Sequence, residues 1–232
     1  MSESAEDRLH RLLALSEALD DDVAKLLRKC PPASTRAAIS VALCRAAFEH
    51  AISQRVLLER GLSGTAMALC RLQFEAVVRA AWTGQGATEK WIKAFTTPVD
   101  AEGHKEPIMG PPIPAMLDTF ALHAPHVAAE FRKLYGTIEG MHSFVHGGAQ
   151  AVVHALMGGY PAENLTRALF NRNLLQWFTA NCAVVAAENA GLRPRLNLLR
   201  EKHGRCMPPI AAAYPAQTSA TETKRPSFSG DL

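Results

Sequence analysis

Five polar side chains fall on one face of a helix predicted near the middle of the chain, over the stretch RKLYGTIEGMHSFVHGG (residues 132–148). At 100° per residue they lie within about 80° of one another. They are Arg132, Tyr135, Glu139, His142 and His146. Gly147 and Gly148 follow as the expected end of this helix, because the last residue of a helix often needs a positive φ. In a chain rich in Ala and Leu, this titratable stripe is the first candidate for chemistry.

A second polar stripe lies on an earlier helix, which is predicted over residues 63–82. Arg71, Glu75 and Arg79 repeat every four residues, whereas the rest of this helix is apolar on nearly every side. A helix of that composition usually lies at the centre of a bundle. Since an unpaired buried charge costs several kcal/mol, we expect these three side chains to meet the later stripe.

Three interpretations fit the two stripes. The first is a buried network of ion pairs and hydrogen bonds that fixes the register of the helices. The second is a metal site, since two histidines four residues apart can bind one ion. However, HSFVH has Ser143 where zinc hydrolases of the HExxH type carry their glutamate base, which excludes that enzyme class.

The third interpretation is metal-independent acid–base chemistry or anion binding. A histidine can move a proton near neutral pH, while an arginine stabilises a phosphate or a pentacovalent transition state. RNA cleavage would need no more than this, because the 2′-OH of the substrate is its own nucleophile.

The pairing of a helix like FEAVVRAAW (Phe74–Trp82) with a later HSFVHGG (His142–Gly148) resembles a group of bacterial helical proteins. These proteins are distantly similar to HEPN domains, the higher eukaryote and prokaryote nucleotide-binding domains, several of which belong to abortive-infection and toxin systems. The resemblance covers residues 71–148, about a third of the chain. It implies an RNA- or nucleotide-directed effector whose candidate catalytic residues are His142, His146, Arg71, Glu75, Arg79 and Glu139.

The chain departs from the motif of active HEPN ribonucleases, in which roughly four to six residues separate an arginine from a following histidine and the site is built across a dimer. Positions 135–141, where that arginine would have to stand, contain none. The spacing does occur between Arg45 and His50, but chance alone provides such a match in a chain with this many arginines and histidines. A ribonuclease would therefore need Arg71 or Arg79 to supply the cation from a neighbouring helix.

The elements that must position these residues are all predicted to be helices. Apolar residues at helical spacing, with caps such as Ser4 and Asp7, predict helices over residues 5–29, 34–60, 63–82, 89–95, 115–122, 125–146, 149–157 and 161–190. A long loop is expected over residues 96–114, and no alternating run of β-branched residues indicates a strand. The sequence thus predicts an all-α fold. It is a single bundle of six to eight helices over residues 5–190, followed by a weakly structured tail over residues 191–232 that is basic and then rich in Pro, Ser, Thr and Ala.

The composition limits the function classes. With 25 Lys and Arg against 22 Asp and Glu, the net charge of +3 is far from that of a dedicated nucleic-acid binder. The acidic start MSESAEDRLH is unlike a signal peptide and no long apolar run predicts a membrane span, so we expect a cytoplasmic protein without a membrane partner. Five cysteines without a CxxC pair, and no phosphate-binding loop or dinucleotide fingerprint, predict no metal, disulfide framework or cofactor.

Two functions of different class remain open. One is a non-catalytic interaction or structural module in which an Arg/Glu/His network is fully buried and fully paired. The alternative is a HEPN-like effector that cleaves RNA without a metal, or binds nucleotides, at a cleft that solvent can reach. Ala-rich helix faces let helices approach closely and fit a homodimer, although tight packing within one chain predicts the same composition.

Overall fold

A computed structural model describes residues 3–97 and 110–208, except for the side chain of Glu139. These residues form ten α-helices and three short 3₁₀ turns, and no strand occurs among them, which confirms the all-α prediction. In chain order the helices are α1 (Ala5–Leu27), α2 (Thr35–Glu59), α3 (Ser63–Gln85), α4 (Glu89–Thr96), α5 (Ile113–Ala121), α6 (Pro125–Ile138), α7 (His142–Val145), α8 (Ala149–Leu156), α9 (Ala162–Ala186) and α10 (Arg193–Lys202).

The helix boundaries follow local chemistry. The Ser4 side chain accepts a hydrogen bond from the backbone N–H of Asp7 at the start of α1, as the capping pattern predicts. Ser34 caps α2 in the same way by accepting from the backbone N–H of Ala37. Between these two helices the chain passes through Pro31 and Pro32, which cannot continue a helix.

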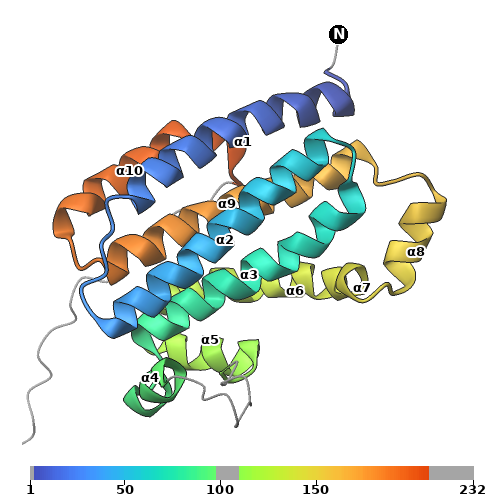
Figure 1. The fold of residues 1–232 in the computed structure, drawn as a ribbon. Helices are drawn as coiled ribbons and strands as arrows, with labels where there is room; N and C mark the ends of the chain where they lie inside the picture. The colour runs from blue at the N-terminus through green and yellow to red at the C-terminus, as the bar shows by residue number, and fades with distance from the viewer. Residues whose placement is uncertain (1–2, 98–109, 209–232) are drawn as a thin grey trace, which may run out of the picture.

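Four long helices build the centre of the fold (Figure 1). Helices α2 and α3 lie side by side, joined by a tight turn in which Gly61 has a φ of 72°. Helix α9 packs against α1, α2 and α3, and α10 covers the side formed by α1 and α9. Helices α5, α6 and α7 pack against α3, so the predicted central position of the 63–82 helix is confirmed.

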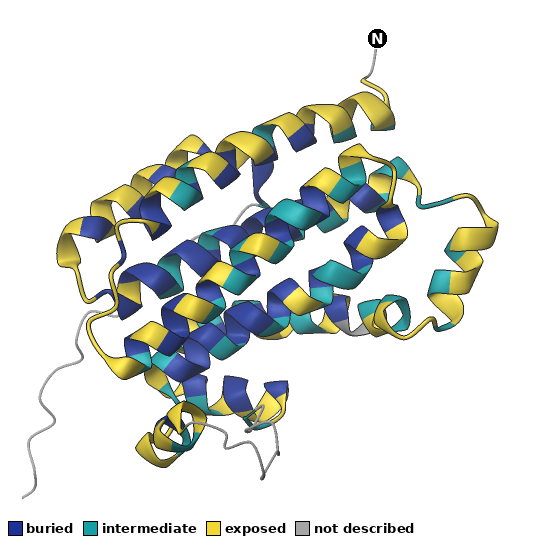
Figure 2. Ribbon diagram, viewed as in Figure 1, coloured by how far each residue is buried: buried dark blue, intermediate teal, exposed yellow. Residues whose placement is uncertain are grey.

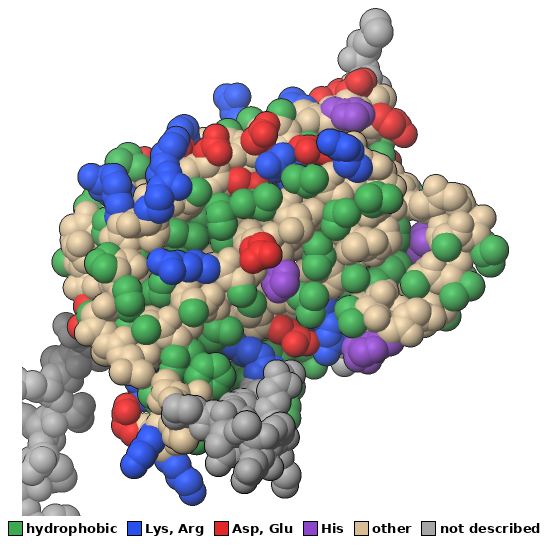
Figure 3. All heavy atoms as spheres, viewed as in Figure 1, with side chains coloured by type: hydrophobic (Ala, Val, Ile, Leu, Met, Phe, Trp, Pro, Cys, Tyr) green, Lys and Arg blue, Asp and Glu red, His purple; other side chains and the backbone are tan. Residues whose placement is uncertain are grey.

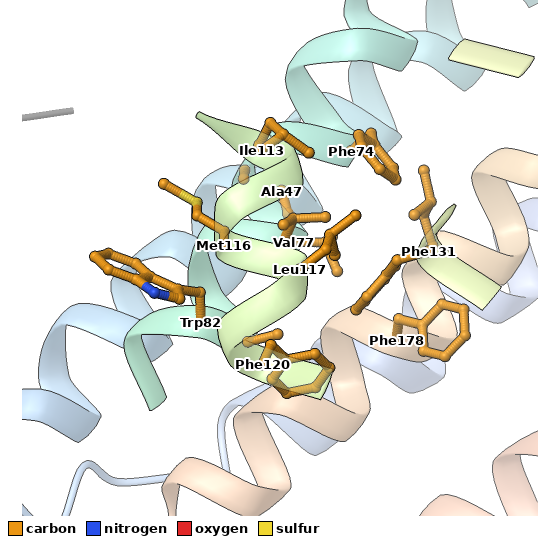
Figure 4. Close-up of a cluster of buried hydrophobic side chains, with 14 of the residues drawn as sticks. Ala47, Phe74, Val77, Trp82, Ile113, Met116, Leu117, Phe120, Phe131 and Phe178 are labelled. Atoms are coloured by element: carbon orange, nitrogen blue, oxygen red, sulfur yellow. The ribbon is translucent and has the colours of Figure 1, made fainter. Parts of the chain in front are cut away.

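The apolar faces meet in two large clusters. One joins α2, α3, α5, α6 and α9, and it contains the aromatic residues shown in Figure 4. There the rings of Phe131 and Phe178 lie 4.7 Å apart between centroids, and Trp82 is buried at the other end of the cluster. The second cluster joins α1 and α9 to α10 through leucines such as Leu196 and Leu199. Figure 2 shows that the buried residues of each long helix face inward.

The helix count exceeds the predicted six to eight for two physical reasons. The helix expected over residues 125–146 ends at Ile138, because a 3₁₀ turn at Glu139–Met141 separates α6 from α7. Two glycines of low helix propensity occur here: Gly136 lies in the last turn of α6, and Gly140 lies within the 3₁₀ turn. The basic segment that follows residue 190 forms α10, because its leucines pack on α1.

The bundle therefore extends past residue 190, where the sequence placed the start of the tail, and continues to Met207, which is buried. The rest of the predicted tail, residues 209–232, and most of the predicted 96–114 loop lie outside the described residues. Within the described ranges, no helix is both long and apolar enough to cross a bilayer.

Candidate functional site

The predicted stripe on α3 is only half-buried. Arg71 donates from Nε to Oε1 of Glu75 at 2.8 Å, and the two side chains keep 25% and 23% of their surface exposed. Arg79 is also half-buried, and among the described side chains it makes neither a hydrogen bond nor an ion pair. Arg71 and Glu75 thus form a local pair along one helix, four residues apart.

The two candidate histidines lie at the two ends of α7, which packs against α3: His142 is the first residue of the helix, and His146 follows it as the C-cap. The rings of His142 and His146 are 4.2 Å apart between centroids, and both residues are exposed. Gly147, at φ 66°, ends this short helix in the left-handed conformation that the sequence predicted. The helices of the two stripes therefore meet, but across the described residues no hydrogen bond or ion pair joins Arg71, Glu75 or Arg79 to either histidine.

The other members of the 132–148 stripe point elsewhere. Arg132 donates to Asp118 of α5 at 2.7 Å, and Tyr135 stacks on Phe74 of α3 with ring centroids 6.0 Å apart. The backbone of Glu139 begins the 3₁₀ turn, while its side chain is outside the described part of the structure. The expected buried Arg/Glu/His network is thus not formed by these described side chains.

A buried polar network does exist, but around Asp20 of α1. Arg172 of α9 donates from Nη2 to both carboxylate oxygens of Asp20 at 2.6 and 2.7 Å, and Arg55 of α2 donates to Oδ2 at 3.0 Å. Gln176 adds a further hydrogen bond to Oδ1 at 3.0 Å. The Arg172 and Asp20 side chains are only 1% and 4% exposed. This network ties three of the four central helices together.

Sequence reasoning missed this network although a signal for it was present. Asp20 continues the buried face of α1 that runs through Leu13, Ser16 and Val23. In the same way, Arg172 stands three residues after Leu169, where the helical period calls for an apolar side chain. A charge on the apolar face of each of two helices indicates that the two charges pair.

A cleft of about 490 Å³ opens beside this network, between α3, α9 and α8. Its floor is a chain of hydrogen bonds that begins at Cys70, whose thiol donates to Oε1 of Gln54 at 3.0 Å. Gln54 donates to Oε1 of Gln73 at 2.9 Å, and Gln73 donates to the backbone carbonyl of Arg172 at 3.1 Å. The floor of the cleft is therefore continuous with the buried ion pairs.

The outer wall of the cleft is aromatic. The rings of His154 and Tyr160 are stacked, 3.5 Å apart between centroids and 18° from parallel. Burial raises the pKa of the Tyr160 hydroxyl to about 12. Burial likewise raises the pKa of the Cys70 thiol to about 12, although nearby Arg172 opposes the shift. Both groups therefore stay protonated at neutral pH and are poor bases and nucleophiles.

The charge of the cleft is set by a single outward-facing arginine. Its described lining contains no Asp or Glu and two arginines, of which Arg172 is already bonded to Asp20. The other, Arg167, is exposed and donates a hydrogen bond to Asn164 on the same helix. The described residues also contain no group of three His, Cys, Asp or Glu side chains arranged to hold a metal ion. The cleft thus presents neutral amides and one cation to a ligand.

With this geometry in view, comparison with known proteins identifies one family. The model of DUF6988, a family of unknown function, matches residues 44–209, which is well over half of the chain. The chain therefore belongs to that family. The match spans the second half of α2 and all helices from α3 to α10, so it includes both the cleft and the two histidines. No curated protein and no solved structure matches the chain.

Proposed function

We propose that this member of the DUF6988 family is a non-catalytic helical module that binds a small polar ligand in the cleft between α3, α9 and α8. The observation that carries the proposal is the amide-rich lining, in which Gln54 and Gln73 are held in place by hydrogen bonds while Asn171 and Gln150 line the rest of the cleft. Amides read both donors and acceptors of a ligand without moving a proton. The volume of about 490 Å³ is within the range of small-molecule sites.

The charge of the lining defines the class of ligand. Since the described lining offers no carboxylate, a cation would find no counter-charge there, whereas an anion would meet Arg167. The aromatic wall of His154 and Tyr160 suits the apolar side of such a molecule. The ligand is therefore neutral or anionic, with hydrogen-bonding groups along one edge.

Three flat probes of matched size test this assignment: benzamide, benzoate and benzamidine. Chemical-shift changes of the full chain in NMR spectra, titrated with each probe at millimolar concentration, should map benzamide and benzoate to the side-chain amides of Gln73 and Asn171. Benzamidine should bind at least about tenfold more weakly, because its charge has no partner in the cleft. Equal binding of benzamidine, or shift changes that map outside the cleft, would refute the proposal.

A pair of arginine variants sharpens the test. Arg167→Gln should remove the preference for benzoate over benzamide, because it removes the cation while keeping a polar side chain of similar length. Arg195→Gln, at an exposed position of α10 outside this cleft, is the matched control and should leave both affinities unchanged. A benzoate preference that survives Arg167→Gln would mean that the anion binds elsewhere.

A second candidate function, RNA cleavage without a metal, is favoured by one specific observation. His142 and His146 are exposed, and their rings lie beside each other at the two ends of α7, which packs against the helix that carries Arg71. One histidine could accept a proton and the other donate one, as in metal-independent RNA cleavage. This candidate also agrees with the sequence resemblance to HEPN domains, which implies an RNA- or nucleotide-directed effector in a defence or toxin system.

A cleavage assay with the full chain on single-stranded RNA tests the second candidate. Cleavage that falls at least about 100-fold in both His142→Ala and His146→Ala would support it. Arg71→Gln should also reduce the rate if this arginine stabilises the transition state. Wild-type protein that leaves the RNA intact would eliminate the candidate. Because both histidines are exposed, their replacement should not unfold the protein, so a loss of cleavage would report on the reaction itself.

A further inference from the structure

Helix α8 has no buried residue, unlike every long helix of the bundle. It spans only eight residues, from Ala149 to Leu156, and projects from the end of the bundle (Figures 1 and 2). A helix of this length is marginal in water unless a face of it packs on something. Its sequence AQAVVHAL also lacks the oppositely charged pairs that stabilise solvated helices.

Exposed apolar side chains gather on this projection. Five of the twelve large apolar residues that are exposed in the described structure lie within residues 145–157. Within these five residues, Leu156 and Met157 are the most exposed, at 83% and 70%, and Val152 and Val153 are each about half exposed. Such a concentration is typical of a surface that is covered by a partner rather than by solvent.

A groove of about 520 Å³ lies directly beside these side chains. Small residues line most of it on both sides, among them Gly64 and Ala68 of α3 and Ala151 and Ala155 of α8. Leu62, which is 54% exposed, stands on its rim. The same surface therefore carries both apolar projections and a hollow that projections of that size can fill.

The projection also carries no net charge. Residues 140–162 contain no Asp, Glu, Lys or Arg, whereas charged side chains of both signs are scattered over the neighbouring bundle face (Figure 3). Contact of α8 with a charged part of the bundle surface would bury charges without partners, at a cost of several kcal/mol. Contact of the projection with its own copy buries none.

We propose that the α8 projection and its groove form the interface with a second copy of this chain. In a two-fold dimer the same patch meets itself, so Leu156 and Met157 of each copy enter the groove of the other. Flexible methionines suit such a contact because they adapt to an irregular hollow. The proposal goes beyond the cleft function and does not rest on it. The two sites nevertheless share α8, because Gln150 and His154 line the cleft and a dimer would hold that wall in place.

Sedimentation velocity of the full chain over a wide range of protein concentrations tests the proposal. The wild type should sediment as a dimer, and Leu156→Glu should raise the dimer dissociation constant at least about 100-fold, because the dimer would bury two unpaired carboxylates. Leu122→Glu is the matched control: Leu122 is 81% exposed but lies at the end of α5, and its variant should remain dimeric. The thermal midpoint at low protein concentration should be the same for both variants, since both positions are on the surface.

A second measurement protects the test against an unfolded variant. Mixed under mild oxidation, the Leu156→Cys and Ala68→Cys variants should form a disulfide-linked dimer, because Leu156 enters the groove that Ala68 lines. Leu122→Cys mixed with Ala68→Cys should stay monomeric on a non-reducing gel. A wild type that is monomeric at all concentrations, or a Leu156→Glu variant that dimerises as well as the wild type, would overturn the proposal. Binding of a monomeric wild type to phosphatidylcholine vesicles would also overturn it, by assigning the apolar face to lipid.

Discussion

Two polar clusters of similar composition occupy opposite physical situations in this bundle. Around Asp20, two arginines and a glutamine surround one carboxylate that is almost completely buried. Along α3 and α7, Arg71 and Glu75 form a half-exposed pair beside two exposed histidines. The first cluster joins helices that are far apart in sequence, whereas the second pairs neighbours on one helix.

The difference between the clusters lies in what removal of one partner would leave behind. Removal of a partner in the buried network leaves a charge without solvent, which costs several kcal/mol. Removal of a partner in the exposed cluster leaves a charge that water can solvate, so the cost is small. The buried network should therefore determine stability, and the exposed cluster is available for function.

The largest expected effect is that of Asp20→Asn. This change keeps the shape of the side chain but leaves Arg55 and Arg172 without their shared counter-charge, so the free energy of unfolding should fall by about 3–5 kcal/mol. Denaturant unfolding followed by circular dichroism measures the loss. Asp21→Asn, at the exposed neighbouring position, is the control and should change the stability by less than about 0.5 kcal/mol. Equal effects of the two variants would mean that the buried network does not stabilise the fold.

The amide chain below the cleft should give the next effect. Gln54→Ala leaves the Cys70 thiol and Oε1 of Gln73 without their buried partner, which should cost about 1–3 kcal/mol. Gln85→Ala, at the exposed end of α3, provides the comparison and should be close to neutral. If Gln54→Ala also leaves the free energy of unfolding unchanged, water replaces the missing amide, and the floor of the cleft is accessible to solvent.

The sequence predicted the fold better than it predicted these clusters. Apolar spacing and caps act within a few residues, so the boundaries of α1, α2 and α3 could be read locally; the capping residues Ser4 and Ser34 illustrate this. The predicted helix through residue 146 runs past the break at Glu139–Met141, because the polar spacing continues across Gly136 and Gly140, whose low helix propensity acts against it. The predicted tail includes segment 193–202, because the basic residues of this segment obscure the short leucine face by which it packs.

The candidate site depends on contacts that no local pattern encodes. Asp20 and Arg172 are 152 positions apart, and neither has a distinctive neighbouring motif. The histidine spacing in HSFVH, by contrast, is conspicuous in the sequence, yet it places both rings on the surface. Local sequence spacing therefore predicts a site at the exposed histidines and gives no comparable motif for the buried Asp20–Arg172 network.

An intermediate case between the two clusters is Asp22, where α1 meets α10. Burial would raise the pKa of this carboxyl, but hydrogen bonds from Lys202, His203 and Lys25 outweigh it and hold the pKa well below the usual 3.8. A carboxyl whose pKa is lowered in the folded state stabilises the protein above its unfolded pKa, and this stabilisation is lost as the pH falls through the folded value.

Asp22→Asn should therefore lower the thermal midpoint at neutral pH, by less than Asp20→Asn because Asp22 is 19% exposed. The gap between variant and wild type should narrow as the pH falls below about 4. Thermal unfolding from pH 2 to pH 7 measures this gap. A gap that is constant over the whole range would show that the loss comes from the altered side-chain contacts and not from the charge.

The smallest effect is expected for His146→Ala, which tests the exposed cluster directly. Since the ring is exposed and its described ring contact is with His142, the free energy of unfolding should change by less than about 0.5 kcal/mol. His203→Ala carries the opposite expectation, because His203 is buried and bonded to Asp22 at 3.0 Å, so its thermal midpoint should fall. If the thermal midpoint of His146→Ala fell by many degrees, this histidine would stabilise the fold as the buried network does, and the contrast between the two clusters would be lost. An unchanged midpoint would leave the histidine pair without a structural role, and the RNA cleavage assay would then decide whether that surface performs chemistry.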